Sequence, residues 1–182
     1  APHYSERPIE ILWVSLALKH QKPLYFGVYY GVQESTSVER VRTEMAHLAE
    51  EIAEMKNEGE VILCMDANAK IGLMGEEPSR NGRMMQDVFE ECGIVVMNTT
   101  GKCKGVVTRQ NRSKEDEKSA IDLITASYDI SQSITNVLVD ESGDFRLKGK
   151  KESDHNTILV DICLTDEKGR EGGGLLQNKI LL

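Results

Sequence analysis

The alternation of apolar and polar residues predicts strands and helices that follow one another along most of the chain. Helical spacing, with an apolar residue every three or four positions, occupies 38–55 behind a predicted capping box of Thr36 and Glu39, and occurs again in 85–92. Extended runs rich in β-branched and aromatic residues stand at 9–18, 24–30, 61–65, 94–97, 119–127, 134–139 and 157–164. The turn at 21–23 joins the first two runs as a hairpin. Strands that alternate with helices are typical of an α/β fold.

The run 61–65 is the most informative, because polar residues follow directly where its burial should end. Its consecutive apolar residues predict a strand buried on both faces. Side chains alternate along a strand, so we expect Asp66 and Asn68 to leave its end on the same side. Ligand sites in α/β folds gather at such strand ends, although a simple Asx-type turn fits the same residues equally well.

Length and composition fit one globular domain. The 182 residues are 40% hydrophobic and 29% charged, which is enough for a sizeable core. The cysteines stand far apart and form no C-x-x-C pair, which favours a reducing compartment and no zinc site. No apolar run approaches the ~18 residues of a membrane span, and no signal-peptide pattern opens the chain.

The two ends of the chain are expected to be irregular. Residues 1–8 are polar and loop-like, and 166–182, with a glycine run at 172–174, are typical of a flexible tail or linker. The chain begins with Ala1 rather than methionine, which predicts an excised or processed piece.

The net charge is −8, so the overall charge of the molecule does not favour binding to nucleic acid. The basic residues are nevertheless uneven. One cluster comprises Lys102, Lys104, Arg109, Arg112 and Lys114, and another comprises Arg146, Lys148, Lys150 and Lys151. Each cluster is as typical of a solvated loop as of a nucleic-acid contact. The position of the cluster relative to other polar residues therefore has to distinguish the two roles.

Further polar residues stand where predicted strands begin or end, namely Tyr30, Asp122, Asp154 and His155. Singly, each has an ordinary explanation: a half-buried strand aromatic, an acid at a sheet edge, and a turn with a surface histidine. Together they supply what hydrolysis of a phosphate ester needs. Carboxylates hold a hard divalent cation, a base orients water, and donors stabilise charge on the phosphoryl oxygens.

Three segments carry a resemblance to a known family. Residues 65–72, the run Ser119-Ala120-Ile121-Asp122-Leu123-Ile124, and the triplet 153–155 resemble the C-terminal motifs of the endonuclease/exonuclease/phosphatase superfamily. They are more similar to the apurinic-like endonuclease domain of non-LTR retrotransposons, whose motifs read Gly-Asp-Phe-Asn-Ala, Ser-x-Ile-Asp-x-Ile and Ser-Asp-His. Asn81-Gly82 and Asn98-Thr99 also match connecting segments of that subgroup, and the similarity runs from about Trp13 to Leu164.

The resemblance implies a fold, a cofactor and partners. The fold is a four-layer α/β sandwich, of which this chain would hold an incomplete part: a domain at 1–165 lacking its N-terminal half. The activity is nicking of DNA by a Mg²⁺-dependent phosphodiester hydrolase, with Mn²⁺ as a substitute. A reverse transcriptase domain would share the parent polyprotein, and the location would be intracellular and, for a retroelement, nuclear.

It also implies roles for individual residues. Asp66 would orient or deprotonate the attacking water, with Asn68 fixing its carboxylate and touching the phosphate. His155 would donate to a phosphoryl oxygen, while Asp122 sets its tautomer. Tyr30 would contact the phosphate or the leaving oxygen.

Asp154 would hold the metal, because adjacent residues point apart and His155 faces the substrate. The basic clusters flank the second and third motifs, where the phosphates of a bound strand would pass; their candidate DNA contacts are Lys102, Lys104, Arg109, Arg112, Arg146, Lys148, Lys150 and Lys151.

The chain also departs from the family pattern. The family's first half brings an asparagine and a metal-binding glutamate ahead of the hairpin, and neither Glu6 nor Glu10 stands in a comparable motif. Val32 and Gln33 replace the proline and asparagine of the tyrosine motif. Two alternatives therefore stay open. One is a phosphomonoesterase or lipid phosphodiesterase of the same fold. The other is a non-catalytic remnant or interaction module, whose missing half leaves a sheet face and an edge open to a partner or to self-association.

Overall fold

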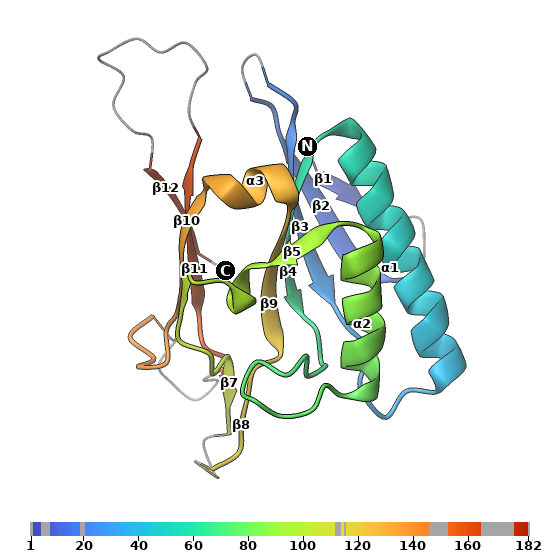
Figure 1. Ribbon diagram of the computed structural model, residues 1–182, viewed down its shortest axis with the longest axis vertical. Helices are drawn as coiled ribbons and strands as arrows, with labels where there is room; N and C mark the ends of the chain where they lie inside the picture. The colour runs from blue at the N-terminus through green and yellow to red at the C-terminus, as the bar shows by residue number, and fades with distance from the viewer. Residues whose placement is uncertain are drawn as a thin grey trace.

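Two β-sheets lie face to face, with two helices on the outer side of the larger sheet (Figure 1). This arrangement comes from a computed structural model that describes residues 2–4, 8–18, 21–111, 114, 116–145, 153–164 and 177–181. The α/β class predicted from the sequence is confirmed.

The larger sheet has six strands in the order β1 (Pro2–Tyr4), β2 (Glu10–Leu16), β3 (Leu24–Tyr30), β4 (Glu60–Asp66), β9 (Asp122–Ser127) and β5 (Ile94–Val96). The second sheet has four, in the order β12 (Gln177–Leu181), β11 (Ile158–Cys163), β10 (Ile134–Val139) and β6 (Cys103–Lys104). A short hairpin joins β7 (Arg109–Gln110) to β8 (Lys118–Ser119). The helices are α1 (Val38–Glu58), α2 (Arg80–Glu91) and α3 (Tyr128–Ser133), with a 3₁₀ turn at Met97–Thr99.

Strand β4 lies at the centre and is buried on both faces, as its apolar run predicts. It runs parallel to β3 and antiparallel to β9. Because side chains alternate, Leu63 and Met65 pack under the helices, whereas Ile62 and Cys64 pack against the second sheet. The predicted hairpin of β2 and β3 is confirmed by their antiparallel pairing.

The helices begin at serine caps that the sequence analysis did not identify. The predicted capping box at Thr36 is wrong by one position, because Ser37 is the cap and its side chain accepts from the backbone N–H of Arg40. Ser79 caps α2 in the same way, so this helix begins five residues earlier than the apolar spacing indicates. Among the described residues, no helix is both long and apolar enough to cross a bilayer.

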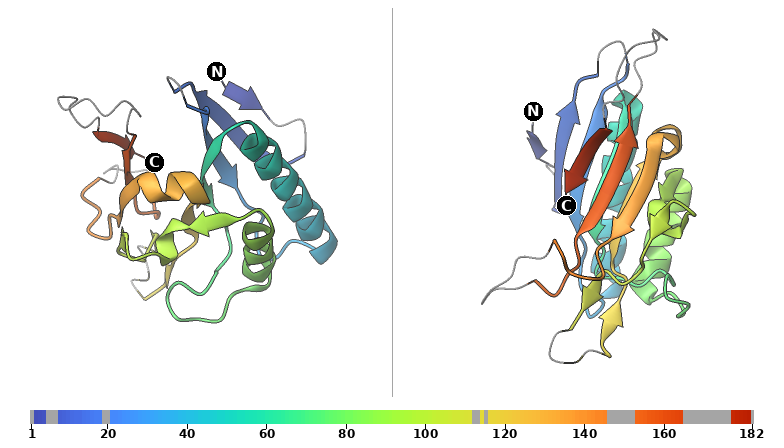
Figure 2. Two further views of the ribbon diagram at one scale, coloured as in Figure 1. Left: turned by 45° about the horizontal axis from the view of Figure 1, so that its top comes forward. Right: turned by 90° about the vertical axis from the view of Figure 1, so that its left-hand side faces the viewer.

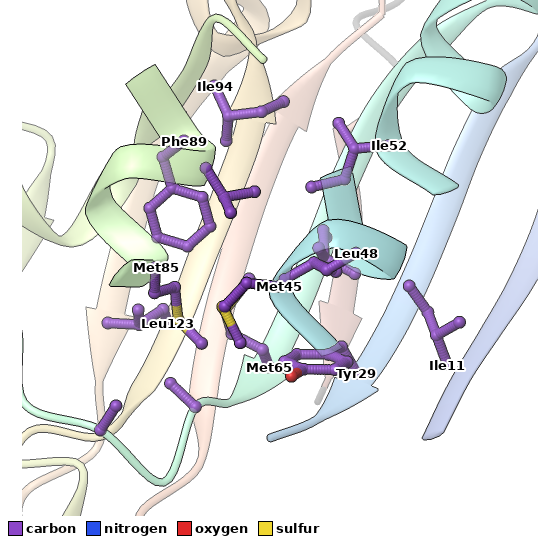
Figure 3. Close-up of a cluster of buried hydrophobic side chains, with 14 of the residues drawn as sticks. Ile11, Tyr29, Met45, Leu48, Ile52, Met65, Met85, Phe89, Ile94 and Leu123 are labelled. Carbon is purple, nitrogen blue, oxygen red and sulfur yellow. The ribbon is translucent and has the colours of Figure 1, made fainter. Parts of the chain in front are cut away.

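A line of acids on α1 ties it to the hairpin beneath it. Glu44 accepts a hydrogen bond from the Tyr29 hydroxyl (2.7 Å), and Glu51 accepts one from the Trp13 indole N–H (2.9 Å). Both carboxylates are buried, so these donors satisfy groups that would otherwise be costly to desolvate. Around them the helices and the sheet enclose an apolar core in which Met45 lies beside Met65 (Figure 3).

Two expectations about the ends were wrong. Residues 2–4, expected in a loop, form β1 on the edge of the larger sheet. Of the expected tail at 166–182, residues 177–181 form β12 on β11, and the rest lies outside the described residues. Pairing with a partner strand, rather than local apolar pattern, determines both edge strands.

Gly27 is required by close packing under α1. A Cβ at this position would lie 2.4 Å from the Trp13 ring and 2.6 Å from Leu63. We therefore expect Gly27→Ala to lower the free energy of unfolding by about 1–3 kcal/mol through overpacking. Urea unfolding of Gly101→Ala, where an added Cβ meets nothing within 4 Å, is the matched control and should change by less than ~0.5 kcal/mol.

Candidate active site

A row of polar residues crosses one end of the larger sheet. Strand register pairs Glu10 with Tyr30, Tyr30 with Asp66, and Asp66 with Asp122. Register partners share a face of the sheet, and here it is the face turned toward the second sheet. The expected convergence of Tyr30, Asp66 and Asp122 at one edge is thus present in the backbone itself.

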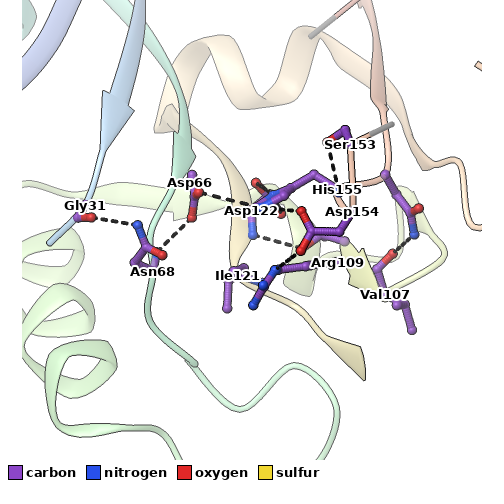
Figure 4. Close-up of polar contacts among 12 residues, drawn as sticks. Gly31, Asp66, Asn68, Val107, Arg109, Ile121, Asp122, Ser153, Asp154 and His155 are labelled. Carbon is purple, nitrogen blue, oxygen red and sulfur yellow. Dashed lines mark hydrogen bonds and ion pairs between the residues drawn. The ribbon is translucent and has the colours of Figure 1, made fainter. Parts of the chain in front are cut away.

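Asp66 opens a tight turn that also holds Asn68. The Asn68 backbone N–H donates to Asp66 Oδ1 (3.0 Å), and its φ of 45° is the only positive value among the described non-glycine residues. The Asn68 side chain donates to the Gly31 carbonyl (2.8 Å) and accepts from Gln33 (3.3 Å), so both ends of its amide are held (Figure 4). The two explanations offered for Asp66 and Asn68, an Asx turn and a site at the strand end, therefore describe the same structure.

Burial raises the pKa of Asp66 above its ordinary value, and the negative charge of Asp122 adds to this. The Asn68 N–H and the charge of His155 act in the opposite direction. A carboxylate with a raised pKa is a better proton acceptor than an exposed aspartate.

His155 is held by Asp122 and faces two further carboxylates. Its Nδ1 lies 3.0 Å from both carboxylate oxygens of Asp122. Its Nε2 lies 4.0 Å from Asp66 Oδ2 and 3.8 Å from Asp154 Oδ1 (Figure 4). The hydrogen bond to Asp122 raises the pKa of His155, against the effect of burial, and the charges of all three acids act in the same sense. The arrangement favours an imidazolium whose Nε2–H points toward Asp66 and Asp154.

Two buried residues position this histidine. Asn156 donates its backbone N–H to the Thr108 carbonyl (2.6 Å) and its side chain to the Val107 carbonyl (2.6 Å). The Thr108 hydroxyl accepts from the backbone N–H groups of Ile121 and Asp122, each at 2.9 Å. One threonine thus links the His155 segment to the start of β9. Sequence reasoning missed Thr108, since no motif marks it, although Asn156 directly follows the Ser-Asp-His triplet.

Asp154 forms an ion pair with Arg109 that the sequence did not predict. The Arg109 Nε donates to Asp154 Oδ2 at 2.7 Å. Burial opposes ionisation of Asp154, but this hydrogen bond and charge outweigh it and lower the pKa of Asp154. Arg109, expected to contact DNA, therefore has one N–H committed to the site, while its side chain stays 45% exposed.

Of the other predicted DNA contacts, only Lys102 and Lys104 lie in the part of the chain that is described. The Lys102 ammonium donates to carbonyls of Ser131 and Gln132 in α3, which follows the end of β9 opposite Asp122. Lys104 is exposed on β6. Arg112, Arg146, Lys148, Lys150 and Lys151 lie outside the described residues.

Two hollows adjoin the polar row. One, of about 360 Å³, is lined by apolar residues such as Val28, Ile124 and Phe145 and reaches Asp66, Asp122 and His155. The other, of about 520 Å³, is polar, and its basic members are Lys70, Arg109 and Lys118, with Asn68 at its wall. Lys70 and Lys118 are cations beside the site that sequence reasoning did not single out.

The site contains groups able to hold a divalent cation. Ligand atoms of Asp66, Asp122 and His155 all lie within 4.8 Å of one another. Asp154, predicted as the metal ligand, is not in this set, although its Oδ1 faces the same imidazole. Because Asp122 already accepts from His155 Nδ1, the oxygens of Asp66 and Asp154 are better suited to a hard cation than the ring nitrogens are.

The paired sheets carry a His–Asp pair and an Asp–Asn turn at their shared end, where the motif resemblance to the endonuclease/exonuclease/phosphatase superfamily places them. The sequence profile of the family described as "Endonuclease-reverse transcriptase" matches residues 24–159, and the chain belongs to this family. Curated protein sequences give no match.

Solved structures with a similar fold include enzymes of several kinds. The endonuclease domain of TRAS1, a telomere-specific non-LTR retrotransposon, is 21% identical with a TM-score of 0.63, over 86% of this chain and 64% of that one. The 3' phosphatase NExo from Neisseria, bound to a product DNA hairpin, is 15% identical with a TM-score of 0.64, over 88% and 70%. A mannosyl-6-phosphatase from Bacteroides thetaiotaomicron is 14% identical with a TM-score of 0.57, over 85% and 57%. The chain thus spans less than two thirds of the TRAS1 domain.

The pairing with Asp122 predicts how His155 titrates. We expect the ring resonances of His155, followed by NMR in EDTA, to titrate above the usual 6.5, and Asp122→Asn to bring the midpoint down. A midpoint unchanged by Asp122→Asn would contradict the pairing.

The same shift makes stability depend on pH. The pKa of His155 is higher in the folded chain than in the unfolded one. The pairing of His155 with Asp122 therefore adds to the free energy of unfolding, and this stabilisation is fully present below about pH 6.5. That contribution is lost as pH rises through the folded pKa. Urea unfolding over this window should show a smaller pH slope in His155→Gln than in the wild type.

Proposed function

We propose that this chain is the catalytic part of a retroelement endonuclease that nicks DNA by Mg²⁺-dependent hydrolysis of a phosphodiester bond. The observation that carries the proposal is the convergence of His155 Nε2 with the carboxylates of Asp66 and Asp154. A reverse transcriptase domain in the same polyprotein, and action in the nucleus, follow from the retroelement assignment. The family membership and the TRAS1 likeness support it.

In this proposal Asp66 acts on the attacking water. The water oxygen forms a bond to phosphorus while the bond from phosphorus to the leaving deoxyribose oxygen breaks, and Asp66 takes the water's proton. Its raised pKa suits a base that must accept a proton near neutral pH. The Asn68 backbone N–H, fixed in place by a side-chain amide that is held at both ends, keeps the Asp66 carboxylate in one orientation.

His155 acts on the phosphoryl group. Its Nδ1–H is used by Asp122, so the proton on Nε2 is free to stabilise charge that develops on a phosphoryl oxygen. Tyr30, next to Asp66 across the sheet, is placed to contact the phosphate or the leaving oxygen.

Asp154 would hold Mg²⁺, or Mn²⁺ in its place, with water completing the shell. When bound, the cation polarises the phosphoryl oxygens and stabilises charge at the leaving oxygen. We further propose that an N-terminal half of the domain, absent from these 182 residues, supplies the glutamate that the family resemblance implies. Glu10 is the alternative, since it ends the polar row.

DNA would lie along the polar hollow beside the site. Three basic residues, Lys70, Lys118 and Arg109, line this hollow beside two acidic ones, Glu34 and Glu117, so the lining has one positive charge in excess within a chain of net charge −8. Local charge, rather than net charge, determines phosphate contacts.

A phosphomonoesterase is the second candidate, because two structural relatives are named as phosphatases. The two activities separate on small substrates. An endonuclease should cleave supercoiled plasmid and leave p-nitrophenyl phosphate untouched, whereas a phosphomonoesterase should do the reverse.

Nicking of supercoiled plasmid tests the endonuclease directly. Where Glu10 completes the site and the 182 residues suffice, we expect Mg²⁺-dependent nicking that EDTA abolishes, with a loss of about 10²–10³-fold in Asp66→Ala, Asp154→Ala and His155→Ala. Circular dichroism of each variant shows whether it is folded. Nicking that survives these changes would rule out the proposed roles.

Glu10→Gln refines the result. Loss of nicking in this variant would assign the missing carboxylate to Glu10. No nicking by a folded wild-type chain would place that carboxylate in the absent N-terminal half, and plasmid binding would then be tested separately.

Salt dependence of DNA binding tests the polar hollow. We expect Lys70→Gln and Lys118→Gln each to reduce the slope of log K against log salt by about 1, as one lost phosphate contact does. Lys22→Gln is the control, since this exposed lysine precedes β3 at the end opposite Tyr30. Slopes that stay unchanged in both hollow variants would place DNA elsewhere.

A further inference from the structure

The Asp122 end of β9 has a strand on one side only. On the side of β4 the pairing continues as far as Asp66 and Asp122, but on the side of β5 it stops at Val96 and Thr125. Beyond that pair the chain leaves β5 through the 3₁₀ turn, which lies beside β9 (Figure 1). No described strand pairs with β9 opposite Asp122 on this side. The backbone groups there therefore need partners other than a strand.

Two side chains take the place of that strand. The Thr108 hydroxyl accepts the backbone N–H of Asp122 at 2.9 Å, and the Asn98 Nδ2 donates to the Asp122 carbonyl at 3.3 Å. The Asn98 Oδ1 also accepts the backbone N–H of Ile124 at 2.8 Å. Side chains thus hold both backbone polar groups of Asp122, whose carboxylate contacts His155.

Thr108 holds the histidine segment as well as the aspartate. It directly precedes β7, at the base of the hairpin that projects beyond both sheets, in yellow in the right-hand view of Figure 2. Thr108 is fully buried, and its carbonyl accepts the backbone N–H of Asn156 at 2.6 Å. The next residue, Arg109, lies opposite His155 in an antiparallel bridge. One short segment therefore contacts the backbone on both sides of the His155–Asp122 pair.

We propose that Asn98 and Thr108 are positioning residues that keep the Asp122 carboxylate within hydrogen-bond distance of His155. Without them, β4 alone would hold the start of β9 in the sheet. An aspartate side chain is short, so a shift of its backbone lengthens the 3.0 Å contact with the ring directly. The inference rests on the proposed function for its catalytic meaning, since His155 there stabilises charge on a phosphoryl oxygen.

The convergence of these hydrogen bonds distinguishes them from ordinary bonds of a buried strand. Thr125, on the same strand and equally buried, donates its hydroxyl to the Leu63 carbonyl at 3.1 Å and holds no residue of the site. The bonds of Asn98 and Thr108 instead meet at Asp122. This role also accounts for Asn98, which stands in a segment that matches the family but has no part in the proposed reaction.

The Nδ1–H resonance of His155 reports the contact directly. In EDTA, at a pH where the ring is protonated, the bond to Asp122 should deshield this proton strongly, and its absence from His155→Gln identifies it. Thr108→Val has almost the same volume and removes the acceptor, so it should move the resonance upfield or lose it to exchange with water. Thr108→Ser keeps the hydroxyl and should restore the wild-type resonance. No charged residue changes in these variants, so the resonance reports position rather than charge.

Asn98→Ala is the second test variant. Asn98 is only half-buried, so the fold tolerates its loss more readily than a change at Thr108, and the resonance should move in the same direction. Thr125→Val is the matched control, because it removes a hydroxyl from the same strand. It should unfold at lower urea concentration and leave the His155 resonance where it is in the wild type.

The resonance is measured without nicking, so the inference and the proposed function fail separately. Where the chain nicks plasmid, Thr108→Val should lower the single-turnover rate by about 10–10²-fold with plasmid binding unchanged, as a small misplacement does. A His155 resonance that stays in place in folded Thr108→Val and Asn98→Ala would overturn the inference and assign both side chains to stability alone. An equal change in Thr125→Val would overturn it as well.

Discussion

The register of β4 against β9 is the constraint on which the site depends. Asp66 stands opposite Asp122, and both continue rows of side chains that otherwise pack between the sheets. Because side chains alternate with a period of two, a slip of one residue by either strand would turn its acid toward the helices and bury it in the apolar core. The hydrophobic burial of Leu63, Ile124 and their neighbours therefore also holds the geometry of the site, since the wrong register would bury a charge.

Three carboxylates surround His155, and two cations balance them in part: the imidazolium of His155 itself and the guanidinium of Arg109. Asp66, Asp122 and Asp154 raise the pKa of the histidine, and Arg109 neutralises Asp154. The remaining negative charge is concentrated on the oxygens that face Nε2. This surplus of negative charge suits a divalent cation, and the hydrogen bonds of Thr108 and Asn156 hold the residues that carry it in place.

The sequence predicts the parts of this molecule whose structure is determined locally. The β4 run, the β2–β3 hairpin and α1 each have a periodic pattern strong enough to be read alone, and the three motif segments fall where the strands end. The edge strands β1 and β12 have no such pattern, because pairing with a neighbour rather than burial determines them. The Arg109–Asp154 pair and the placement of Lys102 on α3 depend on tertiary contacts between residues far apart in the sequence, so charge clustering along the chain gave no guide to them.

The position of β9 has a consequence for biosynthesis. β9 lies between β4 and β5 although both precede it in the sequence, and β5 pairs with β9 alone. As the chain leaves the ribosome, the β3–α1–β4 unit can close early, since its strands are connected through a single helix. β5 then has no strand to join until residue 127 has emerged, and the inner edge of β4 stays unpaired for the same interval. Association of a nascent chain with its neighbours is therefore most easily initiated at the β4 edge, before Asp122 has been added to the sheet.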